Sequence, residues 1–379
     1  MSYDPIYLDH NATTPVAPEV LDAMLAYLRR DYGNPSSEHV LGHRAREAVE
    51  RGRHQVASLI GALPEEIVFT SGGTESNNIA IFGTAARSTP ERRRIITSRV
   101  EHPAVEGPCA RLESSGWKVT RIPVTDVGVV DAVAIDEALG HDVALLTVML
   151  VQNETGVIMP ISAISAAARR FGIVTHTDAA QGLGKIAVDV NALGVDLLSI
   201  AGHKFYGPKG VGALFVRAIT PLEPVLIGAS QERGLRPGTE NVAGIVGLGA
   251  ACELARTRLS TSTSIVEALR EKLWQDLSGE IPELIRHTPM MGSVPNTLLV
   301  SFPDVFGSDV LSLAPGLCAS TGSACHAGER TPSSTLVAMG VAPDVATGVV
   351  RLSLGADTSL NDIENAARML VAAFREVQR

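Results

Sequence analysis

The sequence predicts an α/β protein in which a mostly parallel sheet is layered by helices and followed by a smaller α+β unit. Up to about residue 260, short apolar runs rich in Val, Ile and Leu alternate with helical stretches. The runs lack the polar–apolar alternation of half-exposed strands, which is typical of strands buried on both faces of a parallel sheet. Six runs carry this pattern: EEIVFT, RIITS, VALLTVML, GIVTHTD, VDLLSIAG and GALFVR.

Two helices are expected ahead of the first of these strands. Apolar residues recur at helical spacing from Leu21 to Leu28 and predict an amphipathic helix over residues 18 to 30. The turn-forming stretch YGNPSS ends this pattern, and residues 42 to 60, rich in Arg and Glu, predict a second helix.

The pattern changes near residue 260, where the small polar stretch LSTSTS predicts a boundary followed by a helix over residues 264 to 278. A strand around TLLVSF, a loop holding Cys325, the strand VVRLSLG and a last helix complete the chain, and Ser359 with Asp362 forms a capping box for that helix. We therefore expect a large domain, and a small domain on which the first residues pack: residues 16–259, and residues 1–15 with 260–379.

Composition and charge limit the possible functions. The chain has 379 residues, 45% of them hydrophobic, which is ample for two domains. A formal net charge of −9 without a Lys/Arg cluster argues against nucleic acid as a partner. No apolar run approaches the roughly 20 residues that span a bilayer, so we expect no membrane partner and no export signal. Four cysteines in so long a chain do not form a disulfide framework, which favours a cytoplasmic location.

Polar residues follow several predicted strands, at the sheet edge where open α/β sheets bind ligands. In IVFTSGGTESNN, a strand, a Gly-Gly turn and a helix start place Gly73 and Thr74 where N–H groups and a hydroxyl can hold a phosphate. A tight turn with Thr74 as N-cap is the structural alternative. In IVTHTDAAQ the strand ends at Asp178, whose buried charge needs a partner, either a cationic ring nitrogen or a salt bridge within the protein.

Lys204 follows another strand directly, in LLSIAGHKFYGPKG, between His203 and an aromatic residue. A desolvated lysine can form a Schiff base with an aldehyde, whereas a surface lysine in a turn is the simpler interpretation of Lys204 alone. A phosphate cradle, an acid for a ring nitrogen and such a lysine, each at a strand end, together predict a pyridoxal 5'-phosphate site.

Three further residues have both a functional and a structural interpretation. His102 in VEHPAV could stack on a flat cofactor or move protons, and Thr239 in RPGTEN offers another hydroxyl for a phosphate. Arg351 in VVRLSLG could grip a substrate carboxylate with two hydrogen bonds. A structural histidine, a plain loop and a salt bridge are the respective alternatives.

Other chemistries lack their motifs. The chain contains no G-x-S-x-G, no G-x-x-x-x-G-K-[ST], no H-E-x-x-H and no paired C-x-x-C. A hydrolase elbow, a P-loop and a metal site are therefore not expected.

Ten short motifs follow one another from residue 7 to residue 355: YLDHNATTP, YGNPSS, FTSGGTESNN, EHPAV, NETG, HTDAAQ, GHKFYGPKG, RPGTEN, TGSACHAG and RLSLG. In this order they resemble the motifs of the NifS/IscS-type cysteine desulfurases, which are class V aminotransferase-like enzymes, and of the closely related selenocysteine lyase. The resemblance implies fold type I of the pyridoxal-phosphate-dependent transferases and a homodimer with active sites at the subunit interface.

The resemblance also implies residue roles. Lys204 would hold the cofactor aldehyde, Asp178 would pair with the pyridine nitrogen, and His102 would stack on the ring. Thr239 would reach the phosphate in the partner subunit. The remaining implied contacts are Gln181 and Asn153 at the 3-hydroxyl side of the ring, Gly73, Thr74 and His203 at the phosphate, and Asn11 and Arg351 at the substrate carboxylate.

Cys325 has a role in this resemblance, because a loop cysteine of the family attacks the substrate sulfur, releases alanine and keeps a persulfide for an acceptor protein. Only a thiolate is nucleophilic, so this cysteine needs solvent access or a cationic neighbour such as His326 or Arg330. One departure concerns the cofactor. Ala201 stands where many desulfurases have a serine that donates to the phosphate, so one hydrogen bond is expected to be missing.

Four functions are compatible with these residues. The first is a cysteine desulfurase that acts on L-cysteine, and the second is a selenocysteine lyase that acts on L-selenocysteine. Another fold type I enzyme, such as an aminotransferase, is disfavoured by the Cys325 loop, and a non-catalytic binding protein by Lys204, Asp178 and His102. The sulfur or selenium acceptor is open among iron–sulfur scaffolds, tRNA-thiolation proteins and selenophosphate synthesis.

Overall fold

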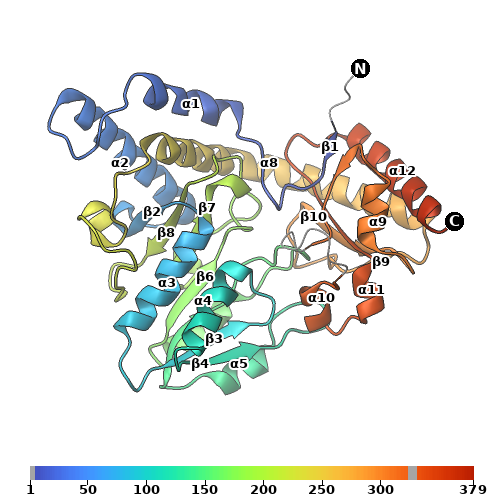
Figure 1. The fold of residues 1–379 in the computed structure, drawn as a ribbon, viewed down its shortest axis with the longest axis horizontal. Helices are drawn as coiled ribbons and strands as arrows, with labels where there is room; N and C mark the ends of the chain where they lie inside the picture. Colours follow the sequence, from blue (N-terminus) through green and yellow to red (C-terminus); the bar gives the residue numbers. More distant parts are fainter. Residues whose placement is uncertain (1–4, 323–330) are drawn as a thin grey trace.

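The predicted α/β architecture is present in the computed structural model, which describes residues 5–322 and 331–379 (Figure 1). A seven-stranded sheet has the order β2-β8-β7-β6-β5-β3-β4. Strands β4, β3, β5, β6 and β7 run parallel, whereas β8 is antiparallel to both of its neighbours. The strands are β2 (Ile67–Thr70), β3 (Arg94–Ser98), β4 (Lys118–Ile122), β5 (Val143–Thr147), β6 (Val174–Asp178), β7 (Leu197–Ala201) and β8 (Gly212–Val216).

All six predicted apolar runs form strands of this sheet. Almost every residue of β2, β3, β5, β6, β7 and β8 is buried, as expected for central strands covered on both faces. The sequence does not predict β4, because KVTRI mixes charged and apolar residues and forms an edge strand that is only partly covered.

Helices surround the sheet, and the two predicted ahead of it are present. Both pack against the long helix α8, while α3 packs on β7 and β8. The helical segments of this unit are α1 (Pro18–Arg29), α2 (Val40–Ile60), α3 (Gly73–Arg87), α4 (Pro103–Glu113), α5 (Ala132–Ala138), α6 (Ile161–Arg169), α7 (Val190–Leu193) and the single turns η1 (Pro64–Glu66), η2 (Gly202–Lys204) and η3 (Gln231–Gly234).

The expected break at LSTSTS is wrong, because one helix of 39 residues, α8 (Val242–Glu280), runs through it from one unit to the other (Figure 1). Ser and Thr are typical of turns, but inside a helix their hydroxyls can bond the carbonyl of the preceding turn. Thr257 Oγ1 does so with Glu253 O at 3.1 Å, and Thr263 Oγ1 with Leu259 O at 2.6 Å. Neither α8 nor any other helix of the described residues is long and apolar enough to cross a membrane.

The C-terminal unit contains a three-stranded antiparallel sheet in the order β12-β10-β9 and a separate two-stranded sheet of β1 and β11, and a single bridge joins Asp9 to Ser353 of β12. β1 pairs in parallel with β11, and Leu8 lies in the same buried cluster as Phe302 and Leu370. The predicted capping box of Ser359 and Asp362 starts the last helix. The elements are β1 (Ile6–Tyr7), β9 (Ile285–Arg286), β10 (Thr297–Ser301), α9 (Gly307–Ser312), β11 (Leu317–Cys318), α10 (Ser334–Ala338), α11 (Pro343–Thr347), β12 (Val349–Ser353) and α12 (Leu360–Val377).

The chain segment after β1 connects this C-terminal unit to the carboxyl end of the parallel strands. His10 N donates to Ser353 O at 3.2 Å in β12, and Thr14 N donates to His203 O at 2.9 Å just after β7. The polar residues that follow the central strands therefore face backbone that comes from the other unit.

A buried ion pair fixes the loop that precedes α8. Arg53 of α2 binds the two carboxylate oxygens of Glu232, each at 2.8 Å, and the same carboxylate accepts the N–H of Phe69 at 2.8 Å. Both charged side chains are buried. Glu232 has a φ of 46°, in the left-handed region that residues other than glycine rarely adopt, so the ion pair holds a strained turn in place.

We expect Glu232→Gln to lower the free energy of unfolding by about 3 kcal/mol, because the Arg53 charge would stay buried without its partner. Asp136→Asn is the matched control, since it breaks an exposed ion pair with Arg170 and should change stability by less than about 0.5 kcal/mol. Denaturant unfolding measures both variants, and equal effects would contradict the prediction.

Candidate active site

Lys204 lies at the centre of the candidate site, in the turn directly after β7. Its Nζ donates to the main-chain oxygens of Asn11 at 2.8 Å and Ala12 at 2.9 Å, in the segment that comes from the other unit. Burial lowers the pKa of Lys204 to about 8, and the nearby Arg351 charge acts in the same direction, while Asp178 opposes it. A useful fraction of the amine is therefore neutral near physiological pH, as a nucleophile requires.

Asp178 ends β6 and is 6% exposed. Its carboxylate accepts hydrogen bonds from Asn77 Nδ2 at 2.6 Å and from Ala180 N at 2.9 Å. No ion pair joins it to another described side chain, so the alternative of a salt bridge within the protein has no support in that part of the chain. The Oδ1 atom of Asn77 is itself buried without a hydrogen-bond partner. A buried carboxylate of this kind would stabilise a protonated ring nitrogen.

His102 follows β3 and is the N-cap of α4, where its Nδ1 accepts the N–H of Ala104 at 3.1 Å. A ring nitrogen that accepts a hydrogen bond carries no proton, so the proton of the neutral ring is on Nε2. Burial lowers the pKa of His102, and the Lys204 charge acts in the same direction. The ring is therefore neutral near pH 7, with one N–H available for proton transfer.

The start of α3 has the features of an anion site. No side chain caps this helix, so the first-turn N–H groups, which include those of Gly73 and Thr74, are not occupied by a cap. The N-cap is Gly72, so the structural alternative with Thr74 as N-cap is wrong. No atom lies within 4 Å of where a Cβ at Gly72 would be, whereas a Cβ at Gly73 would lie 3.3 Å from Ala201 Cβ. The substituted position Ala201 thus borders this anion site.

His203 and Thr239 differ in their relation to the rest of the site. His203 Nδ1 lies 3.1 Å from Thr13 Oγ1, and burial with the Lys204 charge lowers its pKa to about 4, so the ring is neutral. Thr239 is exposed in the loop before α8, a loop that Arg236 ties to Glu75 of α3 at 3.0 Å.

Arg351 of β12 is 3% exposed and is held by several oxygens. Its Nη1 donates to Asn153 O at 3.0 Å and to Gly322 O at 3.3 Å, and its Nη2 donates to Asp9 Oδ1 at 2.8 Å. Its Nε is buried and has no hydrogen-bond partner among the described atoms. The guanidinium therefore keeps its Nε–H and one Nη2–H for a carboxylate.

The side-chain amide of Asn11 is fully engaged within the protein. Its Oδ1 accepts from Lys185 Nζ at 2.8 Å and Asn296 Nδ2 at 3.1 Å, and its Nδ2 donates to Thr297 Oγ1 at 2.9 Å and Asn153 O at 3.2 Å. A contact between Asn11 and a substrate carboxylate would require one of these bonds to break. In the structure, the Asn11 side chain instead connects Lys185, Asn296, Thr297 and the main chain of Asn153.

Gln181 belongs to the same network, because its Nε2 donates to Asn11 O at 2.9 Å, the oxygen that also binds Lys204. The structure therefore joins Lys204, Gln181, Asn11, Asn153 and Arg351 through direct hydrogen bonds. Cys325, with its predicted neighbours His326 and Arg330, lies outside the described residues.

Sequence reasoning did not single out Glu154, although it follows Asn153 in the NETG motif. Glu154 is 4% exposed, and its carboxylate accepts hydrogen bonds from Ser333 Oγ and Thr335 Oγ1, each at 2.7 Å. A Cβ at Gly322 would lie 2.5 Å from Glu154 Oε2. Glu154 thus contacts the chain on both sides of the segment that contains Cys325.

Two other buried ionisable groups of the site were also not predicted. Glu101, which precedes His102, accepts the N–H of Met149 at 3.0 and 3.1 Å, and burial raises its pKa to about 8. Lys185, one turn after Gln181, is 9% exposed. Glu101 stands beside His102 after the predicted strand RIITS, so its position was a usable signal, whereas Lys185 does not directly follow a predicted strand.

The residues at the strand ends form a candidate enzyme site, and comparison with known proteins identifies the enzyme family to which the chain belongs. The sequence model of the aminotransferase class-V family matches residues 6–366, and the chain belongs to this family. Within the family it is a homologue of the NifS/IscS-type cysteine desulfurases. It is 44% identical to the cysteine desulfurase IscS of Dictyoglomus turgidum over 360 residues, which cover 94% of this chain and 91% of the relative.

Solved structures agree with this assignment. A NifS-like protein matches with a TM-score of 0.92 at 36% identity, covering 97% of this chain and 98% of the other. A structure described as SspA in complex with cysteine matches with a TM-score of 0.82 at 37% identity, covering 92% and 98% of the two chains. The expected fold, a type I transferase fold with a mostly parallel sheet, is confirmed.

We expect Glu154→Ala to lower the free energy of unfolding by about 3 kcal/mol, because two buried hydroxyls lose their acceptor. Glu154→Gln keeps an accepting oxygen and should lower it by about 1 kcal/mol. Denaturant unfolding gives both values, and hydrogen exchange over α10 should speed up in the alanine variant alone. Wild-type stability and exchange in Glu154→Ala would show that this carboxylate holds nothing in place.

Proposed function

We propose that the protein is a cysteine desulfurase that uses pyridoxal 5'-phosphate to remove sulfur from L-cysteine, giving L-alanine and a persulfide on Cys325. The main support is the convergence of Lys204, Asp178 and Arg351 at one sheet edge in a chain that is 44% identical to a cysteine desulfurase. The solved relative that is described as a complex with cysteine favours cysteine over selenocysteine as the substrate.

The residues present fit the cofactor. Lys204 is an amine with a lowered pKa for the aldehyde, and Asp178 is a buried carboxylate for the ring nitrogen. The uncapped start of α3 at Gly73 and Thr74 suits the phosphate, with neutral His203 nearby. Asn77 and Asp178 are joined by a hydrogen bond, so α3 connects the phosphate end to the ring-nitrogen end.

Each of these residues would have a defined task. When bound, pyridoxal phosphate supplies an electron sink for the bonds at the substrate Cα. Lys204 Nζ would hold the aldehyde carbon and, once released from it, take the proton from the substrate Cα. Arg351 would orient the substrate carboxylate through its unpaired Nε–H. His102, stacked on the ring, would exchange the Nε2 proton with the substrate thiol.

Cys325 would accept the sulfur. Its Sγ forms an S–S bond with the substrate sulfur while the substrate Cβ–S bond breaks, and the electron pair of that bond takes up a proton at Cβ to give alanine. The sum, cysteine plus a thiol giving alanine plus a persulfide, needs no further oxidant or reductant. Gly322, the last described residue before Cys325 in the sequence, binds Arg351 through its main-chain oxygen at 3.3 Å. Burial raises the pKa of Cys109 to about 12 and also raises that of Cys252, which makes both poor nucleophiles.

The expected partners are part of this proposal. A homodimer would let the exposed Thr239 complete the phosphate site of the partner subunit, and the persulfide would pass to a sulfur acceptor protein. The cytoplasmic location stays a prediction from the sequence. Selenocysteine lyase is the second candidate, because its reaction differs only in the chalcogen.

The first test compares L-cysteine and L-selenocysteine as substrates of the wild type and Cys325→Ala, with alanine and released sulfide or selenide as readouts. We expect alanine from cysteine in the wild type and a loss of at least about 100-fold in the variant, because the nucleophile is gone. Turnover confined to selenocysteine would replace the proposal with selenocysteine lyase. Alanine from neither substrate, despite bound cofactor, would exclude both.

The lowered pKa of Lys204 predicts how cofactor uptake depends on pH. Only the neutral amine attacks an aldehyde, so the rate of pyridoxal phosphate uptake by the apoprotein should rise with pH and level off above about 8. Stopped-flow absorbance measures this rate. Lys204→Arg, whose guanidinium stays charged, should form no covalent link at any pH. A wild-type rate that is independent of pH between about 6 and 9 would contradict the assignment.

A further inference from the structure

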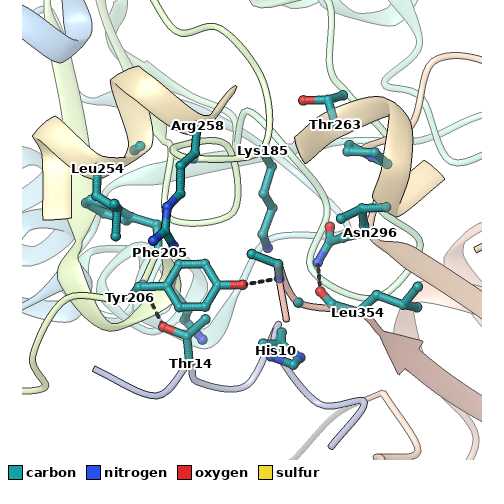
Figure 2. A pocket seen from close by; sticks show the side chains of 17 residues that line it. His10, Thr14, Lys185, Phe205, Tyr206, Leu254, Arg258, Thr263, Asn296 and Leu354 are labelled. Carbon is teal, nitrogen blue, oxygen red and sulfur yellow. Dashed lines mark hydrogen bonds between the residues drawn. The ribbon is translucent and has the colours of Figure 1, made fainter. Parts of the chain in front are cut away.

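A pocket of about 640 Å³ lies beside Lys204, where the two units meet. Lys185 and Asn296 line it together with His10 and Tyr206 (Figure 2). Lys204 itself lines the pocket, whereas Asp178, His102 and the start of α3 do not, so the pocket meets the predicted cofactor contacts only at this lysine. It gives access from solvent to the far side of the network around Asn11.

Lys185 is the unexplained residue of this pocket. It is 9% exposed, and no ion pair joins it to a carboxylate in the part of the chain that the structure describes. Burial, reinforced by the charges of Lys204 and Arg351, lowers its pKa well below the usual value. A buried lysine without an acidic partner is unfavourable for stability. Its presence therefore points to a role in the site.

The two hydrogen bonds of Lys185 define that role. Its Nζ donates to Asn11 Oδ1 at 2.8 Å and to Gln181 Oε1. A side-chain amide accepts through its oxygen and donates through its nitrogen, and these two atoms exchange places when the amide turns over. The amine donates to both amides, so in the structure each presents its oxygen to Lys185, while its nitrogen donates to a main-chain oxygen on the opposite side.

For Gln181, the side that faces away from Lys185 is the candidate active site. The Nε2 atom of Gln181 donates to Asn11 O at 2.9 Å. This is the one hydrogen bond that Nε2 makes within the described residues, although Nε2 carries two hydrogens. The second N–H is available for a ligand. An amide turned over by 180° would present an oxygen there instead, which cannot donate a hydrogen bond.

We propose that Lys185 is a positioning residue that fixes the orientation of the Gln181 and Asn11 amides, so that Gln181 presents an N–H to the ring oxygen of the cofactor. The inference rests on the proposed pyridoxal phosphate chemistry, and it adds a residue that does not touch the cofactor. The same amine also holds Asn11, whose main-chain oxygen binds Lys204.

The test separates orientation from packing. Lys185→Met fills the same space without a donor, and Lys185→Ala leaves a space open to the pocket. If Lys185 orients the amides, both variants should release pyridoxal phosphate about tenfold faster than the wild-type holoenzyme. The pH titration of the cofactor absorbance should also shift, because the ring oxygen loses a donor. Methylammonium should restore slow release in Lys185→Ala but not in Lys185→Met, where the methionine occupies its place.

Wild-type release and titration in Lys185→Met would overturn the proposal, as would a failure of methylammonium to act on Lys185→Ala. If neither variant folds, Gln181→Glu tests the donor that the proposal requires, because a carboxylate presents no N–H in either orientation while Lys185 stays intact. It should remain folded, since the carboxylate faces the amine, and lose cofactor at a similarly increased rate. Retention at the wild-type rate would overturn the inference. A wild type that binds no pyridoxal phosphate would instead refute the proposed function.

Discussion

A cluster of buried basic side chains with few acidic partners, at the carboxyl end of the sheet, is the constraint on which the site depends. Lys185, Lys204 and Arg351 lie together there, and among the described residues only Arg351 contacts a carboxylate, that of Asp9 at 2.8 Å. The two lysines are held instead by neutral oxygens of Asn11, Ala12 and Gln181. Neutral acceptors satisfy the N–H groups without cancelling the charge. Arg351 and the protonated fraction of Lys204 suit ligands that carry phosphate and carboxylate groups.

Asn11 shows how this constraint links the two units. Its main-chain oxygen binds Lys204 and Gln181 beside the central sheet, while its side chain binds Thr297 of β10 and Asn296. The predicted cofactor end and the predicted substrate end of the site therefore share one residue. A displacement of Asn11 would therefore disturb the hydrogen bonds at both the predicted cofactor end and the predicted substrate end.

The sequence predicts the parts of the site that follow from chain-local patterns. Asp178, Lys204 and His102 come directly after apolar strands, so their common location follows from sheet topology. Lys185 and Glu154 could not be recognised this way, because their importance comes from partners more than 170 residues away, Asn11 in one case and Ser333 in the other. Local composition also misplaced the break at LSTSTS, since a Ser or Thr hydroxyl can bond the carbonyl of the preceding helical turn, as that of Thr263 does in α8. Position 325 lies outside the described residues, so the role of its cysteine still depends on sequence and homology.

The pairing of β1 with β11 has a consequence for synthesis on the ribosome. Ile6 lies opposite Leu317, and Asn11 N donates to Ser353 Oγ at 2.9 Å, so this segment is made more than 300 residues ahead of its partners. The parallel sheet can form from chain already released, but Lys204 acquires its Asn11 acceptor in place only when the C-terminal strands arrive. A nascent chain thus cannot complete the candidate site early, and a chain that stops ahead of residue 349, where β12 begins, lacks Arg351.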